Sequence, residues 1–156
     1  MTAAQSLSRE PYIVRSILYG ADELVTEFVR VRIPHMAAIG VSFGPCTAMG
    51  VIRRGVLVGG VVWHNYRKHD IEMSAAFDTP AWCLPQTMRD LWAYPFTQLG
   101  VVRVTTITGR KNKRARSANV RQGFKLEGVA RRALDGRQDA IVYGMLREEC
   151  KWIKET

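Results

Sequence analysis

The chain has 156 residues, 47% of them hydrophobic, which is enough to form one hydrophobic core. Lysine and arginine number 23 against 14 acidic residues, so the formal net charge is +9 at pH 7. Such a surface attracts anions, whether nucleic acid, acidic lipid or a phosphorylated cofactor, and charge alone does not choose among them. We therefore expect one domain over residues 1–156 with an anionic ligand or partner.

The cysteines and the N-terminus narrow the class of protein further. Cys46, Cys83 and Cys150 are odd in number and lack the paired spacing that zinc or redox sites require, so we expect no metal. No basic region followed by an apolar run opens the chain, and no apolar stretch approaches the roughly 20 residues of a membrane span. The sequence predicts a cytoplasmic protein without membrane contact, as a monomer or homodimer.

The first expected elements are an extended segment and a helix. Residues 12–19 are mostly apolar and favour a strand, although a short apolar run also fits a helical turn. Apolar residues between 24 and 29 share one helical face, which predicts a helix over 22–32. Asp22 is its expected N-cap, and Pro34 is expected to end the pattern.

Three β segments follow and predict an antiparallel meander. Residues 47–53 and 56–63 flank a tight turn, and 70–77 follows the polar turn 65–69. The last segment alternates, with Ile71, Met73, Ala75 and Phe77 on one face and Asp70, Glu72, Ser74 and Ala76 on the other.

The period then changes to that of a helix. Pro85 suits the first turn of a helix that extends to Leu99 and that Pro95 should kink or shorten. The alternating residues 102–108 form the next strand, so strand, helix and strand make a parallel crossover.

The last expected elements are a basic helix and a hairpin. The helix runs over 112–122, with Gly123 as its stop. Residues 124–130 and 139–146 form the hairpin, with its turn signal at Asp135-Gly136. The fold class is therefore mixed α/β (α+β), with a mostly antiparallel central sheet, one parallel β-α-β crossover and helices on both faces.

One segment carries a family resemblance. From Asn112 to Gly128 the chain has an asparagine, a small residue three positions on, then Gly123-Phe124 and the acidic-glycine pair Glu127-Gly128. This pattern and the order of elements resemble the GNAT superfamily of N-acetyltransferases. Within it, residues 94–104 and 139–150 are similar to the branch that acetylates ribosomal-protein N-termini. The resemblance covers roughly residues 55–152.

The resemblance implies acetyl-CoA, or another coenzyme A thioester, as the acyl donor. A helix N-terminus in the crossover suits a pyrophosphate, because its first N–H groups are unpaired. Between residues 103 and 137 the chain has 11 basic residues and two acidic ones, a local charge of +9. Phosphates of a cofactor would bind well beside this segment, and so would a nucleic acid.

The expected cofactor loop departs from the family pattern. The family positions for a Gln or Arg and two small residues fall here on Thr79, Trp82 and Leu84. Either the loop binds phosphate through the backbone amides of bulkier residues, or cofactor binding is weakened or lost. Taking the first alternative, we predict these contacts at the start of the crossover helix: Trp82, Cys83, Leu84, Gln86 and Thr87.

Other cofactor contacts follow from the resemblance. The strand Ser74, Ala75, Ala76 and Phe77 would hold the pantetheine arm and stabilise the oxyanion. Asn112 would contact the cofactor, cap the helix, or do both, and Arg116 would reach a phosphate.

Catalysis needs a proton acceptor, because an amine with a pKa of about 10 must lose a proton before it attacks. Glu72 is the candidate base, with Asp70 on the same face as its substitute. Many family members protonate the leaving thiolate with a tyrosine, but the matching position here is Asn119. Tyr143 is the candidate acid instead, and each of these residues also has a purely structural interpretation.

Three functions remain open. The first is direct transfer of an acetyl group to the amine of a small molecule, a protein N-terminus or a lysine. The second is acylation of a nucleic acid held by the basic face, and the third is a non-catalytic module that binds coenzyme A or a polyanion. The acceptor contacts variable loops, so the sequence does not identify it.

Overall fold

The structure, a computed structural model, describes residues 10–39, 42–80 and 84–153. Within these ranges all strands belong to one sheet of order β1-β2-β3-β4-β5-β6-β8-β7. The strands are β1 (Tyr12–Val14), β2 (Ile17–Tyr19), β3 (Cys46–Arg53), β4 (Val56–His64), β5 (Asp70–Phe77), β6 (Arg103–Gly109), β7 (Lys125–Ala130) and β8 (Ala140–Leu146). Within the described ranges β5–β6 is the one parallel pair, as expected of a mixed, mostly antiparallel sheet.

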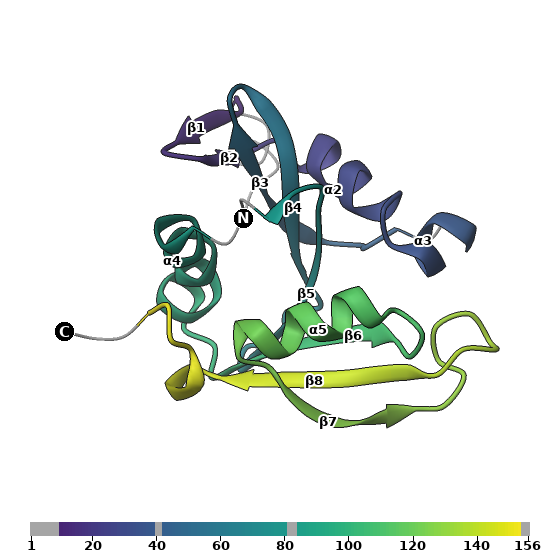
Figure 1. Ribbon diagram of the computed structural model, residues 1–156. Coiled ribbons are helices and arrows are strands. Elements are labelled where there is room, and N and C mark those ends of the chain that lie inside the picture. Colours follow the sequence, from purple (N-terminus) through teal and green to yellow (C-terminus); the bar gives the residue numbers. More distant parts are fainter. Residues whose placement is uncertain (1–9, 40–41, 81–83, 154–156) are drawn as a thin grey trace.

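Helices cover both faces of this sheet (Figure 1). They are α2 (Asp22–Arg30), α3 (Pro34–Ile39), α4 (Pro85–Ala93) with its π-helical continuation η2 (Tyr94–Leu99), α5 (Lys113–Gln122) and a 3-10 turn η3 (Arg147–Glu149). Among the described residues no helix is both long and apolar enough to cross a membrane.

Alternation along the central strands divides the core into two clusters. Val62 of β4 faces α2 and packs with Val25 and Val29, whereas the next residue, Trp63, faces α4 and lies 5.6 Å from the ring of Trp92. The odd-numbered side chains of β5 join the larger cluster on the α4 side, as its period of two predicts. The even-numbered side chains of β5 therefore face the α2–α3 side.

The parallel pair β5–β6 is short, and this opens the sheet. Its register begins at Asp70 opposite Arg103 and ends at Glu72 opposite Thr105. Beyond this point the two strands separate, with strands β3–β5 running nearly upright in Figure 1 and β6–β8 lying across them. The expected parallel crossover is confirmed.

Several helix and strand ends differ from expectation. The predicted N-cap Asp22 is wrong, because Ala21 is the N-cap and the Asp22 carboxylate instead accepts the backbone N–H of Ala48 on β3 at 3.2 Å. The helix ends at Arg30, and Pro34 begins α3 rather than only ending a pattern. A proline fits the first helical turn because its missing N–H is not needed there.

Two other segments also depart from simple periodicity. Residues 12–19 form a tight hairpin rather than one strand, with Arg15 at φ 54° in its turn. The predicted kink at Pro95 takes the form of a π-helical turn that ends at the left-handed Gly100. The missing N–H of a proline interrupts the α-helical ladder, and a wider turn accommodates it.

Candidate functional site

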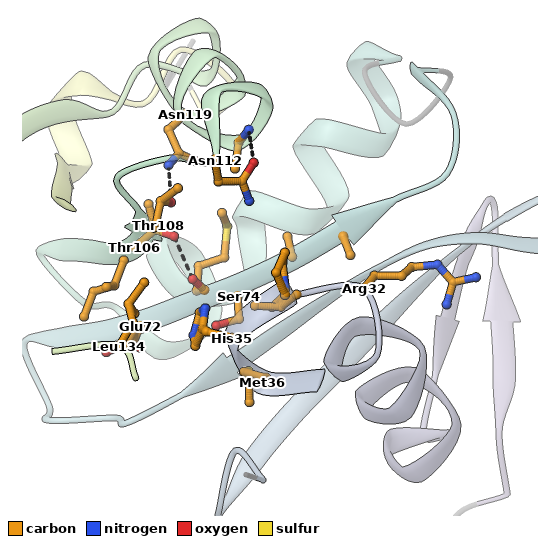
Figure 2. Close-up of a pocket in the computed structure, with 18 of the residues that line it drawn as sticks. Arg32, His35, Met36, Glu72, Ser74, Thr106, Thr108, Asn112, Asn119 and Leu134 are labelled. Carbon is orange, nitrogen blue, oxygen red and sulfur yellow. Dashed lines mark hydrogen bonds between the residues drawn. The ribbon is translucent and has the colours of Figure 1, made fainter. Parts of the chain in front are cut away.

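A cleft of about 820 Å³ lies where β5 and β6 separate. Figure 2 shows Asn112 and Asn119 of α5 on one side and His35 and Met36 of α3 on the other. The two strands form its floor, and the loop between β7 and β8 contributes Leu134. A cleft between splayed strands can hold an extended ligand against exposed backbone.

Glu72 provides the principal carboxylate of this cleft. Its side chain is 16% exposed, and Oε1 accepts a long hydrogen bond of 3.4 Å from the amide of Asn65. Burial raises the pKa of Glu72, and the Asn65 hydrogen bond lowers it only in part. A carboxylate with a raised pKa is a stronger proton acceptor, which suits a general base.

His64 lies directly opposite Glu72 in the β4–β5 register and was not anticipated from the sequence. Burial lowers the pKa of His64 to about 4, so its ring is neutral at pH 7. The contact of 3.5 Å between Nε2 and Glu72 Oε2 is therefore not an ion pair at that pH. The same Nε2 lies 2.9 Å from the hydroxyl of Ser74.

The contacts of His64 with Ser74 and Glu72 raise the question of whether Ser74 could act as a covalent nucleophile. A serine nucleophile relay uses both ring nitrogens, one for the serine and one for the carboxylate. Here Ser74 and Glu72 contact one nitrogen of His64, so the geometry favours direct transfer over an acyl-serine intermediate.

Asp70, the substitute base, is engaged in structural contacts. Its Oδ2 accepts from Arg67 at 2.5 Å, and Oδ1 accepts from the hydroxyl of Thr105 at 2.9 Å and lies 3.4 Å from Arg103 Nε. Asp70 is not among the described residues that line the cleft. Of the two candidate carboxylates, Glu72 lines the cleft, whereas Asp70 is held by structural contacts.

The backbone of Ala75 faces the opening between β5 and β6. Thr106 of β6 donates its hydroxyl to the carbonyl of Met73 at 2.9 Å, so the polar groups of Met73 point toward β6. Asp78 N–H bonds to Val58 of β4, so even-numbered residues point the other way. Because strand backbone groups alternate, the N–H and C=O of Ala75 point toward β6 where pairing has ended.

The other cofactor candidates that line the cleft lie on β5 and at the start of α5. Ser74, Ala75, Ala76 and Phe77 line the cleft together with Asn112. Asn112 is the N-cap of α5, with its side chain accepting from Ala115 N at 3.2 Å. Farther along the same wall, buried Asn119 donates to the hydroxyl of Thr108 at 2.9 Å.

Arg116 and Tyr143 lie elsewhere. Tyr143 is 2% exposed, and its hydroxyl accepts from Arg116 Nε at 3.1 Å. Both residues border a shallow depression next to α5 and are not among the described lining residues of the cleft. The structure therefore does not bring these two residues together with Glu72.

The start of α4 contains the remaining cofactor candidates. Leu84 is the exposed N-cap, Gln86 donates to Asp90 at 3.0 Å, and Thr87 accepts from Arg53 at 2.7 Å. None of these three is among the described residues that line the cleft. Two further candidates lie outside the described residues, namely Trp82 and Cys83.

The opposite end of the cleft carries an ion pair that the sequence did not suggest. Arg32 binds both carboxylate oxygens of Asp78, at 2.8 and 3.0 Å, and its guanidinium lies over the Phe28 ring. This pairing joins the end of α2 to the end of β5, and only the fold brings them together. His64 pairs with Glu72 across the β4–β5 ladder, whereas a hairpin closed through the expected turn 65–69 would have placed it opposite Asp70.

Metal chemistry has no candidate site among residues 10–39, 42–80 and 84–153, where no group of His, Cys, Asp and Glu could hold an ion.

No protein-family model matches the chain, and no curated protein matches it in sequence.

Solved structures do resemble it. A probable acetyltransferase is 25% identical with a TM-score of 0.59, covering 68% of this chain and 63% of that one. This chain thus spans less than two thirds of that protein. A ribosomal-protein-S5-alanine acetyltransferase from Vibrio fischeri is 11% identical, with a TM-score of 0.60 over 92% of this chain and 100% of that one. The spermidine/spermine N-acetyltransferase SpeG from Vibrio cholerae, in mutant forms, is 20% identical, with a TM-score of 0.56 over 66% and 68%.

These similarities agree with the mixed sheet, the short parallel pair and the cleft between its separating strands. Other similar structures are described as GCN5-related or GNAT-family acetyltransferases. The resemblance noted in the sequence is confirmed at the level of the fold: the chain has the fold of the GNAT superfamily.

Proposed function

We propose that this protein is an acetyl-CoA-dependent N-acetyltransferase that moves an acetyl group directly to a substrate amine. The observation that carries the proposal is the position of Glu72, a half-buried carboxylate with a raised pKa, at the point where β5 and β6 separate. The backbone of Ala75 faces the same opening. An acyl acceptor and an acyl donor can meet there.

The chain offers a fitting place for the donor. Acetyl-CoA would supply the activated acyl group as a thioester. The Ser74–Phe77 segment would hold the pantetheine arm, and the N–H of Ala75 would donate to the thioester oxygen. Asn112 would add a polar contact, and the unpaired N–H groups of the first turn of α4 suit the pyrophosphate. Phosphate binding at a helix start requires backbone N–H groups rather than glycine as such, so Leu84 does not oppose it.

Glu72 would accept the proton that the amine loses during attack. A free amine has a pKa of about 10 and is mostly protonated at pH 7, so it needs such an acceptor. Neutral His64 and the amide of Asn65 would hold the Glu72 carboxyl in place without neutralising it by a positive charge.

Protonation of the leaving thiolate would come from solvent. A thiol has a pKa of about 8.5, so water suffices to protonate much of it at pH 7. We assign no such role to Tyr143, because its hydroxyl is bound to Arg116 outside the cleft. Arg116 likewise receives no direct cofactor contact in this proposal.

Cofactor binding is tested by a melting experiment with a steric control. We expect acetyl-CoA to raise the melting temperature, because a ligand at about 100 times its Kd stabilises the folded state by about 2.7 kcal/mol. Ala118→Phe, within the cleft wall, should abolish this rise. Ser117→Phe, on the exposed side of the same helix and outside the cleft lining, should retain it.

The same preparation is then mixed with acetyl-CoA and an amine, and the free thiol is measured over time. Absence of any melting shift with acetyl-CoA would remove the proposal. An equal shift in both phenylalanine variants would show that the ligand binds elsewhere.

A further inference from the structure

The cleft is poor in negative charge. Among its described lining residues the carboxylates are Glu72 and Asp78. Arg32 already binds both oxygens of Asp78, and Arg114 adds a second positive charge that lowers the pKa of Asp78. Only Glu72 is left without a cationic side chain in hydrogen-bonding contact, among the groups described here.

One carboxylate beyond the cleft lining also has partners of its own. Asp135, in the β7–β8 loop, interacts electrostatically with His35 across the cleft. Its Oδ1 accepts the backbone N–H groups of Arg137 and Gln138 at 2.8 and 2.7 Å, which lowers its pKa. This carboxylate stabilises its own loop, and the neighbouring side chains of Arg131 and Arg137 are exposed cations.

The cleft is in contrast well supplied with apolar surface. Ile107 and Leu134 are half-buried and line the cleft, yet neither belongs to the two core clusters of the described residues. Leu134 packs against the end of β6, where a Cβ on Gly109 would meet its Cδ1 at 3.2 Å. Ile33 and Met36 approach from the α2–α3 side. These side chains leave apolar surface available to a ligand.

We propose that the acceptor is a monoamine on an apolar body and that polyamines are excluded. This rests on the proposed function, because it assigns Glu72 to the reacting nitrogen. A second ammonium group in the cleft would lose hydration without gaining a carboxylate partner. It would also meet a chain with a net charge of +9. An alkyl body instead gains by contact with Ile107 and Leu134.

A matched pair of amines tests the inference. Hexylamine and 1,6-diaminohexane have the same carbon chain and differ in the second ammonium group. We expect calorimetric titration of the protein, without any cofactor, to show at least about tenfold tighter binding of hexylamine, since the second ammonium group of the diamine would lose hydration without gaining a carboxylate partner. Spermidine should bind no better than the diamine.

Two variants test whether the preference for hexylamine arises in the cleft. Leu134→Asp puts a carboxylate on the apolar wall and should shift the binding ratio toward the diamine by about tenfold, through loss of apolar contact and gain of a charge partner. Leu126→Asp adds the same charge on β7, where the side chain is 61% exposed and lies outside the cleft lining, and should leave the ratio unchanged.

The outcomes separate this inference from the proposed function. Equal or tighter binding of the diamine, no measurable binding of hexylamine, or an unchanged ratio in Leu134→Asp would overturn the inference, even if acetyl-CoA raises the melting temperature. Failure of acetyl-CoA to bind would instead remove the proposed function, and the cofactor-free titrations would still measure the preference of the cleft.

Discussion

Asp70 and Glu72 lie two residues apart on the same face of β5 and are almost equally exposed, at 15% and 16% of their side-chain surface. Their partners differ. Asp70 contacts Arg67, Arg103 and the hydroxyl of Thr105, whereas Glu72 contacts the neutral groups of Asn65 and His64. Burial without a contacting cation raises the pKa of Glu72.

The comparison shows that partner charge, rather than depth, distinguishes the two carboxylates. Arg103 also binds Glu127 of β7, so Asp70 belongs to a network that ties β5, β6 and β7 together. Glu72 is at the open end of the β5–β6 ladder and faces the cleft. We therefore interpret Asp70 as structural and Glu72 as the base.

The largest expected effect is on turnover by Glu72→Gln. Glutamine keeps the size and hydrogen bonding of the side chain but cannot accept the amine proton, so kcat should fall about 100- to 1000-fold. The melting shift with acetyl-CoA should remain, because the substitution leaves the Ala75 backbone and α4 unchanged. Turnover close to that of the parent chain would remove Glu72 from its assignment.

The sequence predicted most of the framework on which these residues lie. Alternation placed β5 at Asp70–Phe77, and the pattern around α5 gave both its cap Asn112 and its stop Gly123. Such signals are local, because a strand period or a cap depends on neighbours along the chain.

One contact that distinguishes the carboxylates, the Arg67–Asp70 pair, is local, but the others are not. The choice between Asp70 and Glu72 depends in part on Arg103, which is 33 residues from Asp70 and 31 from Glu72 along the chain and, of these two carboxylates, contacts Asp70 alone. Alternation also left open which face of the sheet Tyr143 would occupy, and it packs in the α4-side core rather than in the cleft. Asp22 likewise does not cap its helix, because its carboxylate contacts β3, and only the tertiary fold supplies that contact.

The next effect is on stability in acid. His64 has a folded pKa of about 4, whereas an unfolded histidine titrates near 6.5, so between these values the unfolded chain binds the extra proton. Stability should therefore fall by about 3 kcal/mol from this group as pH falls through that window. Glu72 acts in the opposite direction, because its raised pKa lets the folded chain take up a proton first.

Urea unfolding at several pH values measures this dependence. His64→Gln should flatten the curve between pH 6.5 and 4, while His69→Gln, in the exposed β4–β5 turn, should leave it steep. A parent-like slope in His64→Gln would show that another group governs the acid transition.

A smaller effect is expected from Asp70→Asn. Loss of the carboxylate weakens the contacts with Arg67 and Arg103, which should cost about 1 to 2 kcal/mol of unfolding free energy because the site is half-buried. Turnover should stay within about twofold of the parent, since a base elsewhere does the chemistry. A loss of kcat as deep as that of Glu72→Gln, in a folded variant, would reverse the two assignments.

The smallest effect is expected from Arg67→Ala. Arg67 acts on both carboxylates, because it pairs with Asp70 and its charge also reaches Glu72. The Arg67 side chain is 62% exposed, so its ion pair with Asp70 should contribute only about 0.5 kcal/mol to stability. Its positive charge also lowers the pKa of Glu72 from a distance. Removing that charge should raise the pKa of Glu72 further, and the acid limb of the kcat/KM profile should move to higher pH.

Arg121→Ala, which removes an exposed charge from α5, provides the control and should leave that limb in place. The shift reports the base itself, because the free-enzyme profile follows the group that must be deprotonated for catalysis. A limb that stays fixed or moves to lower pH in Arg67→Ala would mean that the titrating base is not Glu72. An acid limb that moves to higher pH in Arg67→Ala but not in Arg121→Ala would link the raised pKa of Glu72 to its lack of a contacting cation.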